Sequence, residues 1–235
     1  MANYLIEFRL HGYAKKYIKG LIYEVARKFR VRGVTRKRPV PHITLFGPFT
    51  TRYEKRMIVE VANVGRKYFL VPFRVKGFNY FDNETNKTIY NDIGFSEKLE
   101  QIRWEIAERL LKITQTKSVH DVKKNYSFHS TIAFRDIDRR FPKIWEYIKS
   151  KEEPNINQYL LRITILKNGK ILHEYDLMQK RLLSRKEALD RIIWNRTITI
   201  LKDAVKEFGE EIEIEGTLWD RVKLIFNWIK LRGKC

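Results

Sequence analysis

The stretch HITLFGPF, residues 42–49, decides the fold of this chain. Its first residues alternate between polar and apolar, which is typical of a β-strand with one buried face. His42 and Thr44 fall on one face of such a strand, while Ile43 and Leu45 fall on the other. We therefore expect a strand that buries its aliphatic side chains and presents an imidazole and a hydroxyl on an open face.

A second stretch, FHSTIAF at residues 128–134, has the same local pattern. His129 and Thr131 share one face of the predicted strand, opposite Phe128 and Ile132. This second His-x-Thr lies 87 residues after the first, at position 129 against position 42. The two stretches are not close repeats in sequence, so any symmetry between them is expected in the architecture.

Hydrophobic periodicity predicts the elements around these two stretches. Helices are expected at residues 15–30, 54–67, 97–113 and 139–149, and strands at 4–10, 69–81, 88–95, 159–167 and 170–177. The last two strands flank Asn168-Gly169, a strong hairpin signal. The order strand, helix, strand, helix, strands, helix, strand, helix, hairpin suggests two similar halves.

The predicted fold is therefore α+β and bilobal. We expect two pseudo-symmetric halves of antiparallel sheet with outer helices around a central cleft. This domain should cover residues 1–180, with halves at about 1–69 and 70–180. A helical C-terminal extension should cover residues 184–235.

The extension begins where the sequence pattern changes, near Ser184. Ser184 and Glu187 have the spacing of a capping box. Helices are expected at residues 188–208 and 218–231. The second is basic and amphipathic, and its apolar face is expected to pack against the core, with membrane or partner binding as the alternative.

The composition points to a polyanionic partner. Among 235 residues, 48 Lys and Arg against 28 Asp and Glu give a formal net charge of +20. Such a surface attracts nucleic acid, with an anionic membrane surface as the rival and an ordinary solvated surface as the simplest alternative. The single cysteine, Cys235, excludes an internal disulfide and a cysteine-based zinc site, so a reducing, cytoplasmic setting is expected. The chain has no apolar run of membrane-spanning length, and its first ten residues do not form a signal peptide.

The paired motifs His42-Ile43-Thr44 and His129-Ser130-Thr131 resemble the two H-x-[ST] motifs of the 2H phosphoesterase superfamily. The nearest branch is the RNA 2′,3′-cyclic phosphodiesterases, also called the 2′-5′ RNA ligase family, and the resemblance covers about residues 3–180. It implies metal-independent hydrolysis of RNA 2′,3′-cyclic phosphate ends to a 2′-phosphate, without a cofactor, and a reverse reaction that joins RNA ends through a 2′-5′ bond. It also implies His42 as proton donor and His129 as proton acceptor.

The residue types fit this chemistry. Displacement at a cyclic phosphate needs one group to take a proton from water and another to give a proton to the leaving oxygen. Two imidazoles with a pKa near neutrality can do both. The hydroxyls of Thr44 and Thr131 can hold non-bridging oxygens and donate to developing charge. The residues themselves leave open which of His42 and His129 is the acid.

Four further residues are candidates for binding substrate. Arg38 belongs to the basic run at residues 36–38 just before the first motif, where it could contact a phosphate. Tyr80 and Tyr126 could stack a terminal base. Arg135 follows the second motif closely, one place later than the arginine found in many family members, which puts its phosphate role in doubt.

Other interpretations remain open from the sequence. The two motif histidines could be structural, and a histidine-based metal site lacks both helical His spacing and a carboxylate cluster. The remaining histidines, His11, His120 and His173, are expected on the surface or in loops. An RNA-binding module with a non-catalytic cleft would also explain the charge. So would an enzyme of the same superfamily acting on 2′-5′ oligoadenylate or trimming RNA 3′ ends. We expect a monomer.

Overall fold

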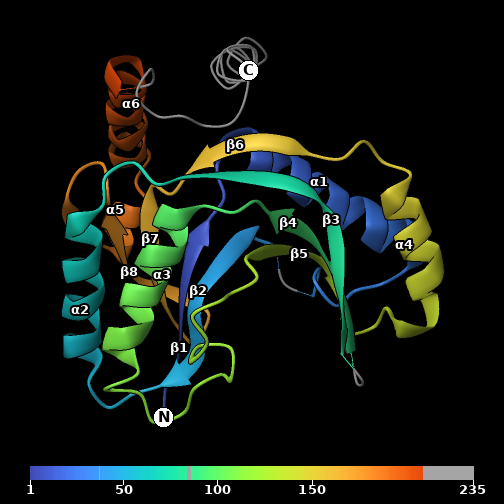
Figure 1. Ribbon diagram of the computed structural model, residues 1–235, viewed down its shortest axis with the longest axis horizontal. Helices are drawn as coiled ribbons and strands as arrows, with labels where there is room; N and C mark the ends of the chain where they lie inside the picture. The colour runs from blue at the N-terminus through green and yellow to red at the C-terminus, as the bar shows by residue number, and fades with distance from the viewer. Residues whose placement is uncertain (37, 84–85, 209–235) are drawn as a thin grey trace.

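Two antiparallel sheets form the scaffold of the computed structural model, which describes residues 1–36, 38–83 and 86–208 (Figure 1). The first sheet has the order β2-β1-β7-β8-β9, with bounds β1 Asn3–Arg9, β2 His42–Thr50, β7 Arg162–Lys167, β8 Lys170–Asp176 and β9 Arg181–Ser184. The second has the order β5-β4-β3-β6, with bounds β3 Pro72–Asn83, β4 Asn86–Ile93, β5 His129–Phe134 and β6 Asn155–Tyr159. The predicted α+β fold with antiparallel sheets is confirmed.

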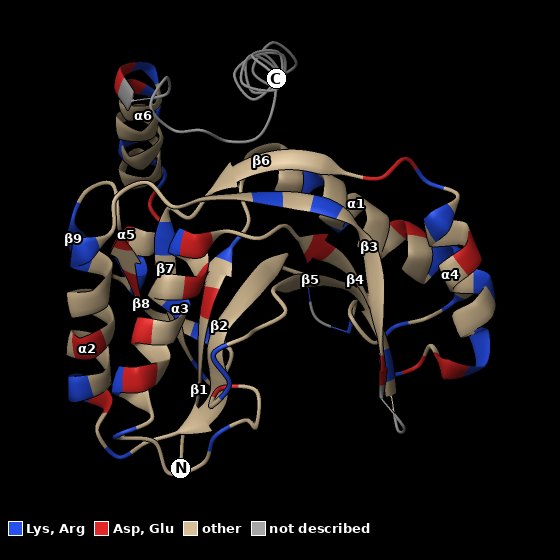
Figure 2. Ribbon diagram, viewed as in Figure 1, with Lys and Arg blue, Asp and Glu red and all other residues tan. Residues whose placement is uncertain are grey.

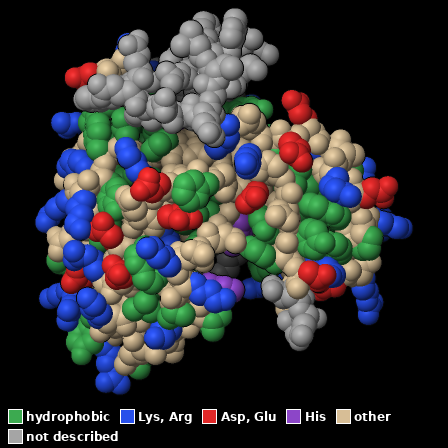
Figure 3. Space-filling view, in the orientation of Figure 1, with side chains coloured by type: hydrophobic (Ala, Val, Ile, Leu, Met, Phe, Trp, Pro, Cys, Tyr) green, Lys and Arg blue, Asp and Glu red, His purple; other side chains and the backbone are tan. Residues whose placement is uncertain are grey.

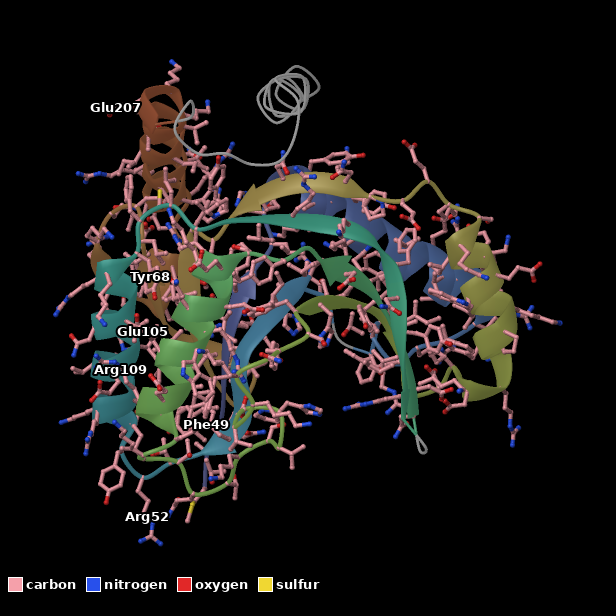
Figure 4. All side chains as sticks on the ribbon, viewed as in Figure 1. Phe49, Arg52, Tyr68, Glu105, Arg109 and Glu207 are labelled. Atoms are coloured by element: carbon pink, nitrogen blue, oxygen red, sulfur yellow. The ribbon has the colours of Figure 1, made fainter. Side chains whose placement is uncertain are left out.

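Helices cover the apolar face of each sheet. Their bounds are α1 Gly12–Phe29, α2 Glu54–Lys67, α3 Glu97–Leu110, α4 Phe141–Lys149, α5 Arg185–Ala188 and α6 Arg191–Phe208, with a 3₁₀ turn at Asp138–Arg140. Helices α2 and α3 pack on the first sheet, and Gly65 of α2 lies directly against the ring of Tyr175. The two helices are also tied to each other, because Tyr68, just after α2, donates a hydrogen bond of 2.8 Å to Glu105 of α3 (Figure 4).

The lobes do not follow the two sequence halves expected at 1–69 and 70–180. Strands β7 and β8 come from the second range but join the first sheet, where Ile6 of β1 pairs with Ile165 of β7. Strand β9, just after that range, completes the same sheet. Helix α1 comes from the first range, yet its Leu21 and Val25 pack with Ile132 of β5. Periodicity tells which face of a strand is buried, but it does not tell which strand will lie beside it. The lobes therefore exchange elements across the predicted boundary.

The elements themselves fall close to their predicted places. Asn168 (φ 51°) and Gly169 (φ 75°) form the predicted hairpin between β7 and β8, with the two positive φ angles of a type I′ turn. The strand expected at 159–167 is instead two strands in different sheets, β6 and β7, joined by the buried Leu160 and Leu161. Because residues 159–166 are mostly apolar, the sequence does not show where the chain passes from one sheet to the other. Strand β9 was not predicted at all.

The described part of the C-terminal extension, residues 184–208, packs against the first lobe. Ser184 and Glu187 form the predicted capping box at the start of α5. Helix α6 buries Thr197, Ile198 and Ala204 against the main core. The helix expected at 218–231 lies outside the described residues. Among the helices that are described, none is both long enough and apolar enough to cross a membrane.

Candidate active site

The two predicted motifs lie on facing edges of the two sheets. His42 is the first residue of β2, the edge strand of the first sheet, and His129 is the first residue of β5, the edge strand of the second. The strands β2 and β5 contact each other. A hollow separates the two lobes on this side of the molecule, and histidine side chains are visible in it (Figure 3). The two motif strands thus lie against each other, and the charge of His42 acts on His129, although the motifs are far apart in sequence.

The two imidazoles are held in the same way. Nδ1 of His42 lies 2.8 Å from the carbonyl oxygen of Val40, and Nδ1 of His129 lies 2.9 Å from that of Ser127, in each case two residues upstream. A carbonyl oxygen only accepts a hydrogen bond, so Nδ1 carries a proton in both rings. Nε2 is therefore the nitrogen that gains or loses a proton at each site. This tautomer leaves both Nε2 atoms available for proton transfer to a substrate.

An ion pair with a buried carboxylate lies beside His42. The carboxylate of Glu7, which is 3% exposed, binds Nε of Arg9 at 2.7 Å through one oxygen. Its other oxygen lies 3.8 Å from Nε2 of His42. In the register of β1 and β2, Arg9 is opposite His42 and Glu7 is opposite Thr44, so all four side chains lie on one face of the sheet. The alternation seen in the sequence therefore extends to the neighbouring strand.

Aromatic rings surround His129 instead. The ring of Phe81 lies 5.0 Å from the imidazole and that of Tyr90 lies 5.1 Å from it, between ring centroids. Burial lowers the pKa of His129 below its ordinary value, and the nearby His42 lowers it further. The hydrogen bond to Ser127 and the charge of Asp92 act in the opposite direction. His129 is therefore neutral over more of the pH range than a free histidine, as a proton acceptor must be.

The two threonines have the same orientation as their histidines. Thr44 shares a strand face with His42, and Thr131 shares one with His129; both are partly exposed. Within the described part of the chain, neither hydroxyl makes a hydrogen bond. Each is therefore free to bind an oxygen atom of a ligand.

Tyr80, one of the two predicted base platforms, lies outside this space. Its ring packs against Phe141 and Trp145, on the side covered by α4. The reason is a β-bulge at Gly77, where φ is +61° and the register of β3 against β4 shifts by one residue. The extra residue reverses the phase of the strand. Phe81, not Tyr80, consequently turns toward His129.

The other predicted substrate residues are scattered. Tyr126 packs against the guanidinium of Arg103 at 4.5 Å, and burial raises the pKa of this tyrosine to about 12. Arg135 is exposed just beyond the end of β5 that is far from His129. Arg38 is exposed, four residues before His42. Along the chain, Tyr126 lies three residues before His129 and Arg38 lies four residues before His42, but the ring of Tyr126 is turned toward Arg103.

The segment before the second motif is fixed by residues that the sequence did not single out. Arg103 of α3 is fully buried and donates hydrogen bonds to the carbonyls of Lys123 and His120, at 2.6 and 2.9 Å. Asp121, also buried, accepts from the backbone N–H of Gly47 in β2. The loop that leads to His129 is thereby attached to the lobe that carries His42. An arginine within a helical apolar pattern is the one signal that could have drawn attention to this link.

The remaining histidines have structural surroundings. His11 was expected on the surface, but its ring packs between Phe8 and Trp194 and its Nε2 lies 3.0 Å from the carbonyl of Tyr159. Burial lowers its pKa to about 4. His120 is exposed, as predicted. In residues 1–36, 38–83 and 86–208, no three His, Cys, Asp or Glu side chains gather in a way that could hold a metal ion.

Two antiparallel sheets whose contacting edge strands each begin with His-x-Thr are consistent with the two-histidine, or 2H, phosphoesterase superfamily. Sequence comparison gives the family: residues 22–170 match the 2'-5' RNA ligase superfamily, and the chain belongs to it. No curated protein matches the chain by sequence.

Among solved structures, the chain is similar to Usb1 of Kluyveromyces marxianus, at 11% identity over 78% of this chain and 97% of that one, with a TM-score of 0.45. The same protein with uridine monophosphate matches with a TM-score of 0.43, at the same identity and coverage.

Proposed function

We propose that the protein is a metal-independent phosphodiesterase that opens 2′,3′-cyclic phosphate ends of RNA to a 2′-phosphate. The observation that carries this proposal is the matched geometry of His42 and His129. Both sit at the start of an edge strand, both are fixed through Nδ1, and neither Nε2 makes a hydrogen bond within the described residues. Membership of the 2'-5' RNA ligase superfamily supports the same chemistry.

In the proposed reaction, Nε2 of His129 takes a proton from water and the water oxygen attacks phosphorus. The bond from phosphorus to the 3′ oxygen breaks on the opposite side, and Nε2 of His42 gives its proton to that oxygen. The pKa of His129, lowered by burial, suits it to begin the cycle without a proton. The carboxylate of Glu7 lies 3.8 Å from Nε2 of His42 and can orient that ring. The reverse sequence of steps would join two RNA ends through a 2′-5′ bond.

Thr44 and Thr131 would bind the two non-bridging oxygens, where charge builds up during the displacement. Phe81 is the residue best placed to contact the terminal base. It is partly exposed, and it lies next to His129 on the same side of β3. It replaces Tyr80 and Tyr126 in that proposed role.

The test is product analysis of an oligonucleotide that ends in a 2′,3′-cyclic phosphate, in the presence of EDTA. We expect a 2′-phosphate product from the wild type and a drop in kcat of about 10²- to 10⁴-fold in His42→Ala and in His129→Ala. His120→Ala, which removes an exposed loop histidine, should keep near-normal turnover.

Near-normal turnover in either motif variant would rule out the two-histidine mechanism. If the wild type binds RNA in a salt-dependent manner but forms no product, the chain is an RNA-binding module. A product formed only from 2′-5′ oligoadenylate, or only by trimming an RNA 3′ end, would assign a different substrate within the superfamily.

A further inference from the structure

A group of cations lies beside His42 and has no role in the proton transfers. Arg9 is the nearest, because it faces His42 across the β1–β2 pair on the same side of the sheet. Neighbouring strands are about 5 Å apart. The side chain of Arg9 is 27% exposed, so it reaches solvent at the edge of the site. It was not recognised from the sequence, where it lies within the predicted strand at residues 4–10, two residues after Glu7.

The guanidinium of Arg9 is held at one end only. Its Nε donates to Glu7 at 2.7 Å, which fixes the orientation of the group. Its two terminal amino groups make no hydrogen bond within the described part of the chain. A guanidinium anchored in this way presents two parallel donors, the arrangement that matches two oxygens of a phosphate.

Lys15 and Arg38 extend this group. Partial desolvation lowers the pKa of Lys15, and the charges of Lys19, Arg9 and Arg38 lower it further, while Glu174 opposes them. Lys15 therefore lies within electrostatic reach of both arginines. Neither Lys15 nor Arg38 forms an ion pair with a carboxylate in the described residues.

Holding like charges close together costs free energy, which a bound anion would offset. Lysine and arginine elsewhere in the molecule are spread over many helices and strands (Figure 2). Arg9 faces His42 across the strand pair, and Lys15 of α1 and Arg38 of the loop before β2 lie within electrostatic reach of this group. We call Arg9, Lys15 and Arg38 the basic wall.

We propose that the basic wall binds the phosphodiester immediately 5′ to the terminal cyclic phosphate, so that the protein selects RNA oligonucleotides over free cyclic nucleotides. This inference rests on the proposed function. The terminal phosphate would occupy the space between the two His-Thr pairs. The basic wall begins one strand away from His42 and four residues before it, which suits the next phosphate along the chain.

The experiment compares two substrates: uridine 2′,3′-cyclic phosphate, which has one phosphate, and an RNA tetranucleotide ending in the same group. Arg9→Gln, Lys15→Gln and Arg38→Gln should each raise KM for the tetranucleotide about tenfold. In each variant kcat should hold on both substrates, and so should KM for the mononucleotide. The slope of log KM against log salt concentration should fall by up to about 0.7 in these variants, the value for one neutralised phosphate of a single strand. Lys143→Gln, on exposed α4 surface, is the matched control and should change none of these values.

Equal losses on both substrates would overturn the proposal, because they would mean that the wall acts on the terminal phosphate or on the fold. Unchanged KM for the tetranucleotide would overturn it too. Glutamine at position 9 can still donate to Glu7, and Lys15 and Arg38 are exposed, so at least two of the variants test binding without disturbing the core.

Failure of the proposed function can be told apart from failure of this inference. Fluorescence anisotropy of a labelled tetranucleotide that ends in a 3′-phosphate measures binding without turnover. If no cyclic phosphate is opened but the three variants still weaken this binding about tenfold, the basic wall is supported and the proposed reaction is wrong. If turnover is normal and the variants bind as tightly as the wild type, the proposed reaction is supported and the role of the basic wall is wrong.

Discussion

The two lobes present the same motif but support it by different means. Behind His42, the first sheet carries buried charge: Arg162 of β7 binds Asp176 at 2.8 Å and Glu174 at 3.3 Å, and all three side chains are almost fully buried. Around His129, the second sheet offers the rings of Phe81 and Tyr90. The comparison teaches that a local motif does not determine its surroundings. Two imidazoles held in the same way can therefore differ in their proposed roles, one as proton donor and the other as proton acceptor.

Helix α6 of the C-terminal extension contacts the buried charges of the first sheet. Thr197 of α6 donates to Asp176 at 2.5 Å and accepts from Arg162 at 2.7 Å. The backbone N–H groups of Met178 and Gln179 also donate to Asp176. Thr197 thus adds hydrogen bonds to a buried ion pair that lies in the same sheet as His42.

The largest expected effect breaks that ion pair. Asp176→Ala leaves Arg162 buried without its closest carboxylate, which should lower the free energy of unfolding by about 3–5 kcal/mol. Urea denaturation measures the change. Asp203→Ala, an exposed carboxylate on α6, should alter stability by less than about 0.5 kcal/mol. A loss of under about 1 kcal/mol in Asp176→Ala would show that the first lobe does not depend on this charge pair.

The next prediction tests whether the two motifs contribute equally to charge stabilisation. Thr44→Val and Thr131→Val each remove one hydroxyl while keeping the shape, and kcat/KM should fall about 10²-fold in each. Steady-state kinetics on the cyclic-phosphate oligonucleotide gives the ratio. Thr199→Val, exposed on α6, should leave kcat/KM unchanged. A large effect in only one of the two motif variants would mean that a single threonine holds the phosphate.

A third prediction concerns the aromatic surroundings of His129. Burial lowers the pKa of this imidazole, and the base must be unprotonated to act, so kcat/KM should fall only at a pH below the ordinary value for histidine. Phe81→Ala lets water reach the ring, which should raise the pKa of His129 and move the acidic limb of the pH profile to higher pH. Phe141→Ala, whose ring contacts Tyr80 on the α4 side, is the control and should not move the limb. A shift to lower pH in Phe81→Ala would contradict the role of burial.

The smallest expected effect comes from the residue between His129 and Thr131. The hydroxyl of Ser130 is buried without a hydrogen-bond partner in the described structure. Ser130→Ala should therefore be neutral or stabilising by up to about 1 kcal/mol. Ser96→Ala should instead destabilise by about 1 kcal/mol, because Ser96 caps α3 by accepting from the N–H of Leu99. Clear destabilisation by Ser130→Ala would mean that its hydroxyl has a partner such as a bound water.

Much of the candidate site could be predicted because the signal was local. The alternation around His42 and His129 fixed which side chains share a strand face, and the hairpin at Asn168-Gly169 followed from the two residues that tolerate positive φ. Tyr80 could not be placed, because the bulge at Gly77 shifts the phase of β3. Arg9 could not be recognised, because its significance lies in facing His42 across a strand pair.

The sequence by itself determined the two strand faces that carry imidazole and hydroxyl, since neighbouring residues in a strand point to opposite sides whatever the rest of the chain does. Only the tertiary structure decided that both faces meet, that β7 to β9 return to the first sheet, and that Arg9 and Phe81 flank the histidines. Strand pairing and packing join residues that are distant along the chain, and hydrophobic periodicity carries no information about which of them will become neighbours.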